Sequence, residues 1–206
     1  MSAESTTSPR RRPAKRGEGD RLRDEIVLAA CGLLAETGEM SSLSLRAVAR
    51  KVGVATTSIY LHFDNLGALQ RAVKDRWLDM LTAEVEAAAS EAGDDPRERI
   101  LAISHAYVDA GMRDPARYRV LFTSELLPLP DGVQYLGGGT FEAVLQIVRQ
   151  ALPDHVDASL FTMQFWCALH GIVTLRQARP NFPWPDLHLQ VDDLVTRLVD
   201  SAVHSV

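Results

Sequence analysis

The chain has 206 residues, 46% of them hydrophobic and 24% charged, which is enough to bury one large core or two modest ones. It has no run of 18 apolar residues and no apolar N-terminal stretch typical of a signal peptide, so we expect a cytoplasmic protein without a membrane partner. The net charge of −5 is unevenly spread: residues 1–76 carry 13 Lys and Arg against 9 Asp and Glu, whereas residues 77–206 carry 9 against 18. A basic front and an acidic back are typical of a protein that places one end on a polyanion.

The first 19 residues form a basic tail without apolar periodicity, which we expect to be disordered when free. Its cations before Gly17 are Arg10, Arg11, Arg12, Lys15 and Arg16. Such a tail either keeps a protein in solution or acts as an arm that lies along phosphates or enters a minor groove. Both interpretations stay open, and the second makes these five residues candidates for DNA binding.

A first helix is predicted over residues 20–37, where apolar residues recur at helical spacing and Gly38 follows. Next, residues 44–63 predict a helix, a short turn and a second short helix. Ser44 suits the N-cap of the first of these helices, and Gly53 suits the left-handed conformation that ends it. In the second, Ile59 and Phe63 share an inward face by their i, i+4 spacing.

Polar side chains are then left outward or on the flanks of the second short helix: Thr56, Thr57, Ser58, Tyr60 and His62. Hydroxyl groups bind base edges or phosphates, and a threonine methyl packs against a thymine methyl. An ordinary helical hairpin would share the apolar periodicity, but not the glycine turn, the polar short helix and the closing Tyr-x-His-Phe-x-Asn. The segment therefore predicts a helix-turn-helix that enters the major groove of double-stranded DNA.

A long helix is predicted from Asn65 to about Ser90, and further helices follow over residues 96–112, 115–122, 140–152, 157–179 and 186–202. No strand pattern or internal repeat is present. We therefore predict an all-α fold of about nine helices, with a three-helix DNA-binding domain over residues 20–66 and a second domain over residues 67–206. The two cysteines, Cys31 and Cys167, lie on apolar helical faces in different domains and are predicted to be buried free thiols.

The second domain combines aromatic residues with a few polar ones, and its candidates for ligand binding are Trp77, His105, Tyr107, Met112, Tyr118, Phe122, Phe141, Phe165, Trp166 and His170. A plain helical core explains most of them, but an apolar cavity with few polar groups is also what a small-molecule site needs. The sequence contains no nucleophile elbow, zinc-protease motif or metal-spaced Cys/His cluster. We therefore predict no catalytic residue, metal or cofactor, although an all-α enzyme that uses His105 or His170 stays a weaker alternative.

The stretch from about Arg21 to Leu69 resembles the DNA-binding domain of the tetracycline-repressor family of bacterial regulators, on the residues Leu45, Arg46, Val48, Ala49, Gly53, Val54, Ser58, Ile59, Tyr60, His62, Phe63, Asn65 and Leu69. The resemblance implies that Arg46 reads a base and that residues 56–58 face the groove. It also implies phosphate contacts for Ser44, Tyr60 and His62.

Two residues depart from the family pattern. Ala55 replaces a capping serine, so we expect Thr56 or Thr57 to cap the helix that follows. Leu66 replaces a lysine that binds phosphate, so we expect other basic groups, such as those of the arm, to supply that contact.

In the second domain, Trp166, His170 and Gly171 resemble the Trp-His-Gly subgroup of this family, together with the segment Asp114-Pro115-x-x-Tyr118-x-x-Leu121-Phe122. We prefer His170 as a core or interface histidine over a ligand contact, and Gly171 suits a close approach of helices. The last two helices are apolar along more than one face, which indicates a partner.

The resemblance implies an unidentified small-molecule effector between the helices of the second domain, a homodimer through the last two helices, and a pseudo-palindromic operator. These expectations describe a ligand-responsive repressor. A ligand-independent DNA-binding repressor is the alternative.

Overall fold

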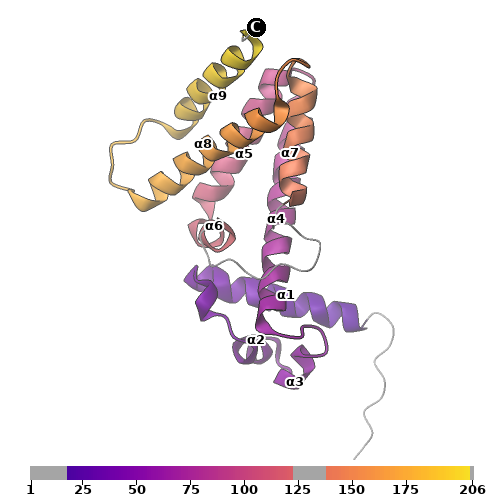
Figure 1. The fold of residues 1–206 in the computed structure, drawn as a ribbon. Coiled ribbons are helices and arrows are strands. Elements are labelled where there is room, and N and C mark those ends of the chain that lie inside the picture. Colours follow the sequence, from indigo (N-terminus) through magenta and orange to yellow (C-terminus); the bar gives the residue numbers. More distant parts are fainter. Residues whose placement is uncertain (1–17, 123–137, 205–206) are drawn as a thin grey trace, which may run out of the picture.

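The structure is a computed structural model that describes residues 18–122 and 138–204, and this part of the chain forms nine α-helices and one 3-10 helix, with no strand. The helices α1 to α3 form a small domain at the lower end of Figure 1, and the helices α4 to α9 rise from it. The all-α fold is as predicted.

The small domain holds α1 (Glu18–Thr37), the 3-10 helix η1 (Met40–Ser42), α2 (Leu45–Val52) and α3 (Thr56–Ile59). Its core contains side chains with no exposed surface from all three α-helices: Ile26, Ala30, Leu34, Val48 and Ile59. The apolar periodicity of α1 and α2 therefore points inward, as predicted, and α1 packs behind the helix-turn-helix.

The second domain begins with the long helix α4 (Leu66–Glu91). It continues with α5 (Pro96–Arg113), α6 (Pro115–Phe122), α7 (Gly138–Ala151), α8 (Ala158–Ala178) and α9 (Leu187–His204). Helix α5 is central, because α4, α6, α7, α8 and α9 all pack on it.

Side-chain caps start three of the helices, and the predicted cap at Ser44 and stop at Gly53 are confirmed. The side chains of Ser44 and Asn65 each accept a hydrogen bond from the backbone N–H three residues on, at 3.2 and 2.9 Å. Asp95 accepts from two N–H groups of the first turn of α5. Gly53 has φ of 80°, the left-handed conformation that ends α2 without strain in a residue lacking Cβ.

Helices α4 and α6 join the two domains. Figure 1 shows α4 running from the small domain up through the second one. Val73 and Trp77 of α4 and Val120 of α6 are buried in the core of the small domain. In addition, a Cβ built on Gly38 at the end of α1 would lie 3.2 Å from the Cα of Ala116 in α6. The core of the small domain thus extends beyond residue 66, into helices that also belong to the second domain.

Three details differ from the sequence predictions. Cys31 and Cys167 are free, but only Cys31 is half-buried, where burial raises the pKa of its thiol to about 11; Cys167 is exposed. Gly171 is not a site of close helix approach, because a Cβ there would meet nothing within 4 Å. That role belongs to Gly111 of α5, where a Cβ would lie 2.7 Å from Cγ1 of Val173.

Helix α8 is long and apolar enough to cross a membrane by length and composition, whereas the sequence was expected to contain no such segment. Its Phe165, Leu169 and Val173 are buried in the core of the second domain. A core helix of a water-soluble domain meets the same criteria. Packing therefore accounts for the buried part of this helix, which is 33% of the apolar window, and leaves Leu160, Met163 and Leu175 exposed.

Candidate functional site

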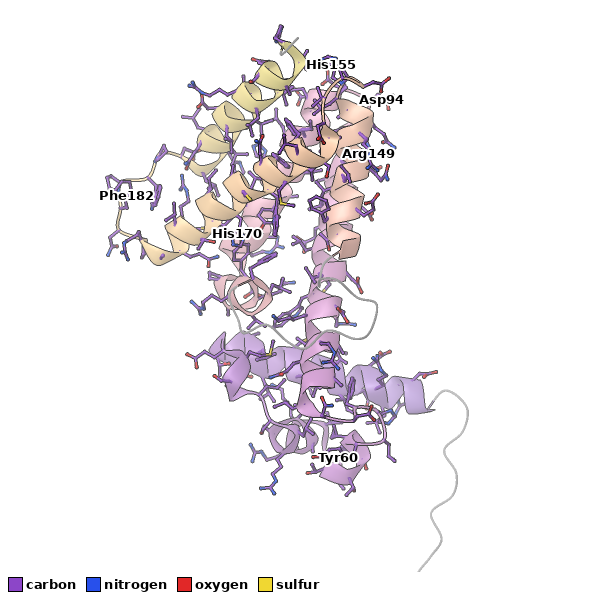
Figure 2. The ribbon with its side chains drawn as sticks, in the orientation of Figure 1. Tyr60, Asp94, Arg149, His155, His170 and Phe182 are labelled. Carbon is purple, nitrogen blue, oxygen red and sulfur yellow. The ribbon has the colours of Figure 1, made fainter. Side chains whose placement is uncertain are left out.

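The predicted DNA-contacting side chains gather at the free end of the small domain, where Figure 2 labels Tyr60. Ser44, Arg46, Thr57 and Tyr60 are exposed, and Thr56 and His62 are half-buried. These six residues come from α2, α3 and the turns beside them. An exposed end that combines a guanidinium, hydroxyls and an imidazole suits contacts to phosphates and base edges.

Ser58 is a correction to the predicted set, because it is only 5% exposed. Helix α3 is a single turn that ends at Ile59, so Ser58 lies beside Ile59 on the inward side instead of facing the groove. The predicted cap is also wrong: Ala55 is the N-cap residue of α3 and no side chain caps it, neither Thr56 nor Thr57. In the first turn of α3, the backbone N–H of Ser58 donates to the carbonyl of Ala55 at 2.9 Å.

One residue at this end was missed. Leu61 follows Tyr60 and is 77% exposed, the most exposed large apolar side chain in the described part of the chain. Its position out of phase with Ile59 and Phe63 was the available signal. An exposed leucine beside hydroxyl groups suits contact with a thymine methyl.

The basic side chains at this end of the small domain differ in whether they form an ion pair. Arg46 and Arg50 of α2 are exposed, whereas the ammonium of Lys51 pairs with Glu36 of α1 at 3.0 Å. Lys51 therefore ties α2 to α1, and the two arginines are available to a polyanion. Arg10, Arg11, Arg12, Lys15 and Arg16 of the predicted arm lie outside the described residues, so their role stays a prediction.

The second domain contains a cavity of about 470 Å³ between α4, α5, α7 and α8, with the end of α6 at one side. Its described lining is almost entirely apolar and consists of Lys74, Leu78, Leu81, Val85, Ile103, Tyr107, Leu121, Phe122, Thr140, Phe141, Val144, Thr162, Met163, Phe165, Trp166 and Leu169. Small-molecule sites are commonly apolar hollows of about 300–1,000 Å³ with few polar groups. Five predicted ligand residues line it, namely Tyr107, Phe122, Phe141, Phe165 and Trp166.

The other five predicted ligand residues are not among its lining. Trp77 is buried in the core of the small domain, and Met112 packs against the core of the second domain. His105 pairs with α9, and Tyr118 and His170 contact the lining residue Tyr107 instead of the cavity. Residue type predicted all ten, but only the packing of the helices decides which of them border the hollow.

His170 ends a chain of hydrogen bonds that begins in the cavity wall. Nε1 of Trp166 donates to the hydroxyl of Tyr107 at 3.3 Å, the Tyr107 and Tyr118 hydroxyls lie 2.9 Å apart, and the Tyr118 hydroxyl lies 2.6 Å from Nδ1 of His170. Burial lowers the pKa of His170, which favours a neutral ring whose Nδ1 accepts from Tyr118. Burial also raises the pKa of Tyr118 to about 12, so its hydroxyl stays protonated. This arrangement agrees with the preferred interpretation of His170 as a partnered core histidine.

His105 of α5 stacks on His188 of α9 in a separate cluster. Its Nε2 lies 2.7 Å from a carboxylate oxygen of Asp192, and Nε2 of His188 lies 2.8 Å from one of Asp109. The two imidazole rings stack, with centroids 4.5 Å apart. The hydrogen bond with Asp109 raises the pKa of His188, with the charges of Asp186 and Asp192 acting in the same direction.

The ion pair between His188 and Asp109 should make a pH-dependent contribution to the free energy of unfolding. Because the folded-state pKa of His188 is raised, the stabilisation is complete below the unfolded value of about 6.5 and is lost as the pH rises through the folded value. His188→Gln should lower the free energy of unfolding near pH 6 by up to about 1 kcal/mol, since the pair is half-exposed, and by less near pH 9. Urea unfolding across this range measures the difference. A loss that is equal at both pH values would contradict the role of the ion pair, and His155→Gln is the control.

Two family models match this chain, one over the small domain and the start of α4 and the other over most of the second domain. Residues 26–73 match the family described as bacterial regulatory proteins, tetR family, and residues 100–202 match the tetracyclin repressor-like C-terminal domain. The chain is also 33% identical over 168 residues to the HTH-type transcriptional regulator Rv0681 of Mycobacterium tuberculosis, covering 80% of this chain and 72% of that one. The chain belongs to the tetracycline-repressor family.

Solved structures share the fold of this chain. A protein from Rhodococcus sp. RHA1 has 26% identity and a TM-score of 0.70, with 90% of this chain and 95% of that chain covered. The regulator FadR from Bacillus subtilis, solved in complex with stearoyl-CoA, has 15% identity and a TM-score of 0.61, with 89% and 98% covered. At that identity the FadR likeness shows the fold alone.

As a tetracycline-repressor family member, the chain is a transcriptional regulator with a helix-turn-helix DNA-binding domain and is not an enzyme. The family assignment confirms the predicted resemblance at the level of the family. Membership of the Trp-His-Gly subgroup stays a prediction, because the matching C-terminal description is the general one.

Proposed function

We propose that this regulator is a cytoplasmic homodimeric repressor that a small-molecule effector releases from a pseudo-palindromic operator. The observation that carries the proposal is the position of the 470 Å³ cavity, which borders both α4 and α6. These are the two helices whose residues also enter the core of the DNA-binding domain. A molecule in the cavity thus contacts the elements that hold the recognition helix.

Helix α6 supplies a short physical route between the two sites. Leu121 and Phe122 line the cavity, while their neighbour Val120 has no exposed surface in the core of the small domain. An effector that fits only when α6 shifts also shifts the end of α1, against which α6 packs. A coupling of about 1–3 kcal/mol would lower DNA affinity, and by linkage DNA would weaken effector binding by the same factor.

Exposed apolar side chains on α8 and α9 support the homodimer. They are Leu160, Met163, Trp166, Leu175, Leu189 and Val203. An apolar surface of this kind in an otherwise charged protein indicates a protein partner, and a two-fold axis makes the same surface meet itself. The bound stearoyl-CoA in the fold neighbour FadR supports an effector site in a domain of this architecture.

Selection of bound sequences from a random duplex pool tests the dimeric repressor. We expect a pseudo-palindrome whose half-site centres lie whole helical turns apart, about 34–36 Å per turn. Leu175→Arg with Leu189→Arg should give a monomer by light scattering and weaken operator binding by about 100-fold, because each half-site then binds alone. Ala83→Arg with Ala87→Arg on the exposed side of α4 adds the same charge as a control. An asymmetric selected site, or an unchanged mass for the first pair, would refute the proposal.

Deletion of residues 1–17, which leaves α1 intact, should weaken operator binding and make its salt dependence shallower. Each lost phosphate contact should reduce the slope of log K against log salt concentration by about 0.9. Titrations at four salt concentrations give the slope, and substitution of Arg10, Arg11 and Arg12 by glutamine in the full chain should reproduce part of the change. An unaltered slope would leave the tail with no contact to DNA.

A further inference from the structure

One side chain in the largely apolar cavity wall carries a charge. Lys74 is the only charged residue in the described lining, and it is 5% exposed. It occupies the same stripe of α4 as three apolar lining residues, Leu78, Leu81 and Val85, at the i+4, i+7 and i+11 positions. Within residues 18–122 and 138–204, its ammonium has no hydrogen-bond or ion-pair partner.

An ammonium held in an apolar wall without an anion is unfavourable, because apolar surroundings replace part of its water without compensating charge. Burial accordingly lowers the pKa of Lys74. A leucine or methionine would complete the apolar stripe of α4 at no such cost. A buried, uncompensated cation in a hollow is therefore a candidate for binding an anion that the cavity receives.

The other polar groups of the wall are largely engaged within the protein. The hydroxyl of Thr140 accepts from Thr82 at 2.7 Å, and that of Thr162 donates to the carbonyl of Ala158 at 2.7 Å. The Tyr107 hydroxyl belongs to the chain that ends at His170. One positive charge in an apolar wall matches one negative charge on a largely apolar molecule, and a dianion would be left half-compensated.

We propose that the effector is an amphipathic monocarboxylate whose head group pairs with Lys74 and whose apolar body lies against the aromatic side chains of α7 and α8. The proposal rests on the effector site of the proposed function and names its ligand class. Lys74 is also the point where the cavity meets the DNA-binding domain, since its neighbours Val73 and Trp77 are in that domain's core. The carboxylate would thus bind α4 where the helix leaves the small domain.

Probes that share one apolar chain but differ in the charge of the head group test the carboxylate proposal on the full-length protein. Dodecanoate, dodecan-1-ol and dodecyltrimethylammonium are compared below their micelle concentrations, by calorimetry and by tryptophan fluorescence, to which Trp166 of the cavity wall contributes. Charge-assisted pairs are roughly twice as strong as neutral hydrogen bonds, so dodecanoate should bind at least about tenfold more tightly than the alcohol, and the cationic probe most weakly. The pair 2-naphthoate and 2-naphthylmethanol repeats the test with a ring body.

Lys74→Met should remove the preference for the acid, by about tenfold, and leave the affinity for the alcohol equal or higher. This variant removes a buried charge, so we expect it to fold. Lys74→Arg should retain the preference, and Lys51→Met, which removes a lysine from the DNA-binding domain, should change neither affinity. Equal binding of acid and alcohol to the unaltered protein, or a preference that survives in Lys74→Met, would overturn the proposal.

Val144→Trp distinguishes a wrong carboxylate proposal from a wrong proposed function, because the indole ring fills the cavity. If acid and alcohol bind equally and both are lost in Val144→Trp, the cavity is a ligand site and the carboxylate proposal is wrong. If no probe binds, or Val144→Trp leaves all binding unchanged, both the carboxylate proposal and the effector cavity are refuted.

Discussion

Replacing Arg46 and Tyr60 together by alanine should lower the affinity for the operator by about 100-fold or more and leave the fold and the mass in solution unchanged. Both side chains are exposed, Tyr60 by 54%, and neither belongs to the core of the small domain. A contact to a base or a phosphate that is lost costs about 1–3 kcal/mol, so two losses reach this range. Fluorescence anisotropy on the selected operator, at one fixed salt concentration, measures the change.

The matched control removes an arginine and an aromatic residue elsewhere. Figure 2 shows Arg149 and Phe182 in the second domain, well away from Tyr60. Arg149→Ala with Phe182→Ala should leave operator affinity unchanged. Ser58→Ala should also leave affinity unchanged, because Ser58 is buried. If the first pair has no effect, the exposed end of α2 and α3 is not the DNA-binding surface.

Much of the fold follows from local sequence signals, since caps and apolar periodicity depend on neighbours along the chain. Asp95 and Pro96 start α5 because a carboxylate and a ring with fixed φ satisfy the first turn regardless of the rest of the fold. The length of α3 was not predictable in this way. Its single turn leaves residues after Ile59 in a turn, and Ser58 is buried because the small domain closes over it.

The candidate sites show the same division between local and tertiary information. Which residues are exposed on α2 follows from its period, and Arg46 was placed correctly on the surface. Which aromatic residues border a hollow depends on five helices at once. Lys74 was missed because a lysine on a helix is normally solvated. Helix α4 packs on α5, α6 and α7, and no local pattern encodes the burial that this tertiary packing gives Lys74.

Gly111→Ala should lower the free energy of unfolding by about 1–3 kcal/mol, the usual cost of overpacking a core. An added Cβ would lie 2.7 Å from Cγ1 of Val173 in α8 and 3.0 Å from Cδ2 of Tyr118 in α6, so both of these helices resist it. The intrinsic gain of alanine over glycine in a helix, up to about 1 kcal/mol, opposes this cost without cancelling it. Urea unfolding at one fixed protein concentration measures the change, because the stability of the proposed dimer would depend on concentration.

Gly139→Ala is the control, because a Cβ there meets nothing within 4 Å and the change should be neutral or stabilising. Val173→Ala removes the atom that clashes, so the double variant should lose at least about 1 kcal/mol less than the sum of the single losses. Tyr118, which the added Cβ would displace, is hydrogen-bonded to Tyr107 in the wall of the 470 Å³ cavity. Gly111→Ala should therefore alter probe binding as well as stability, and additive losses in the cycle would show that α8 does not press on α5 at this point.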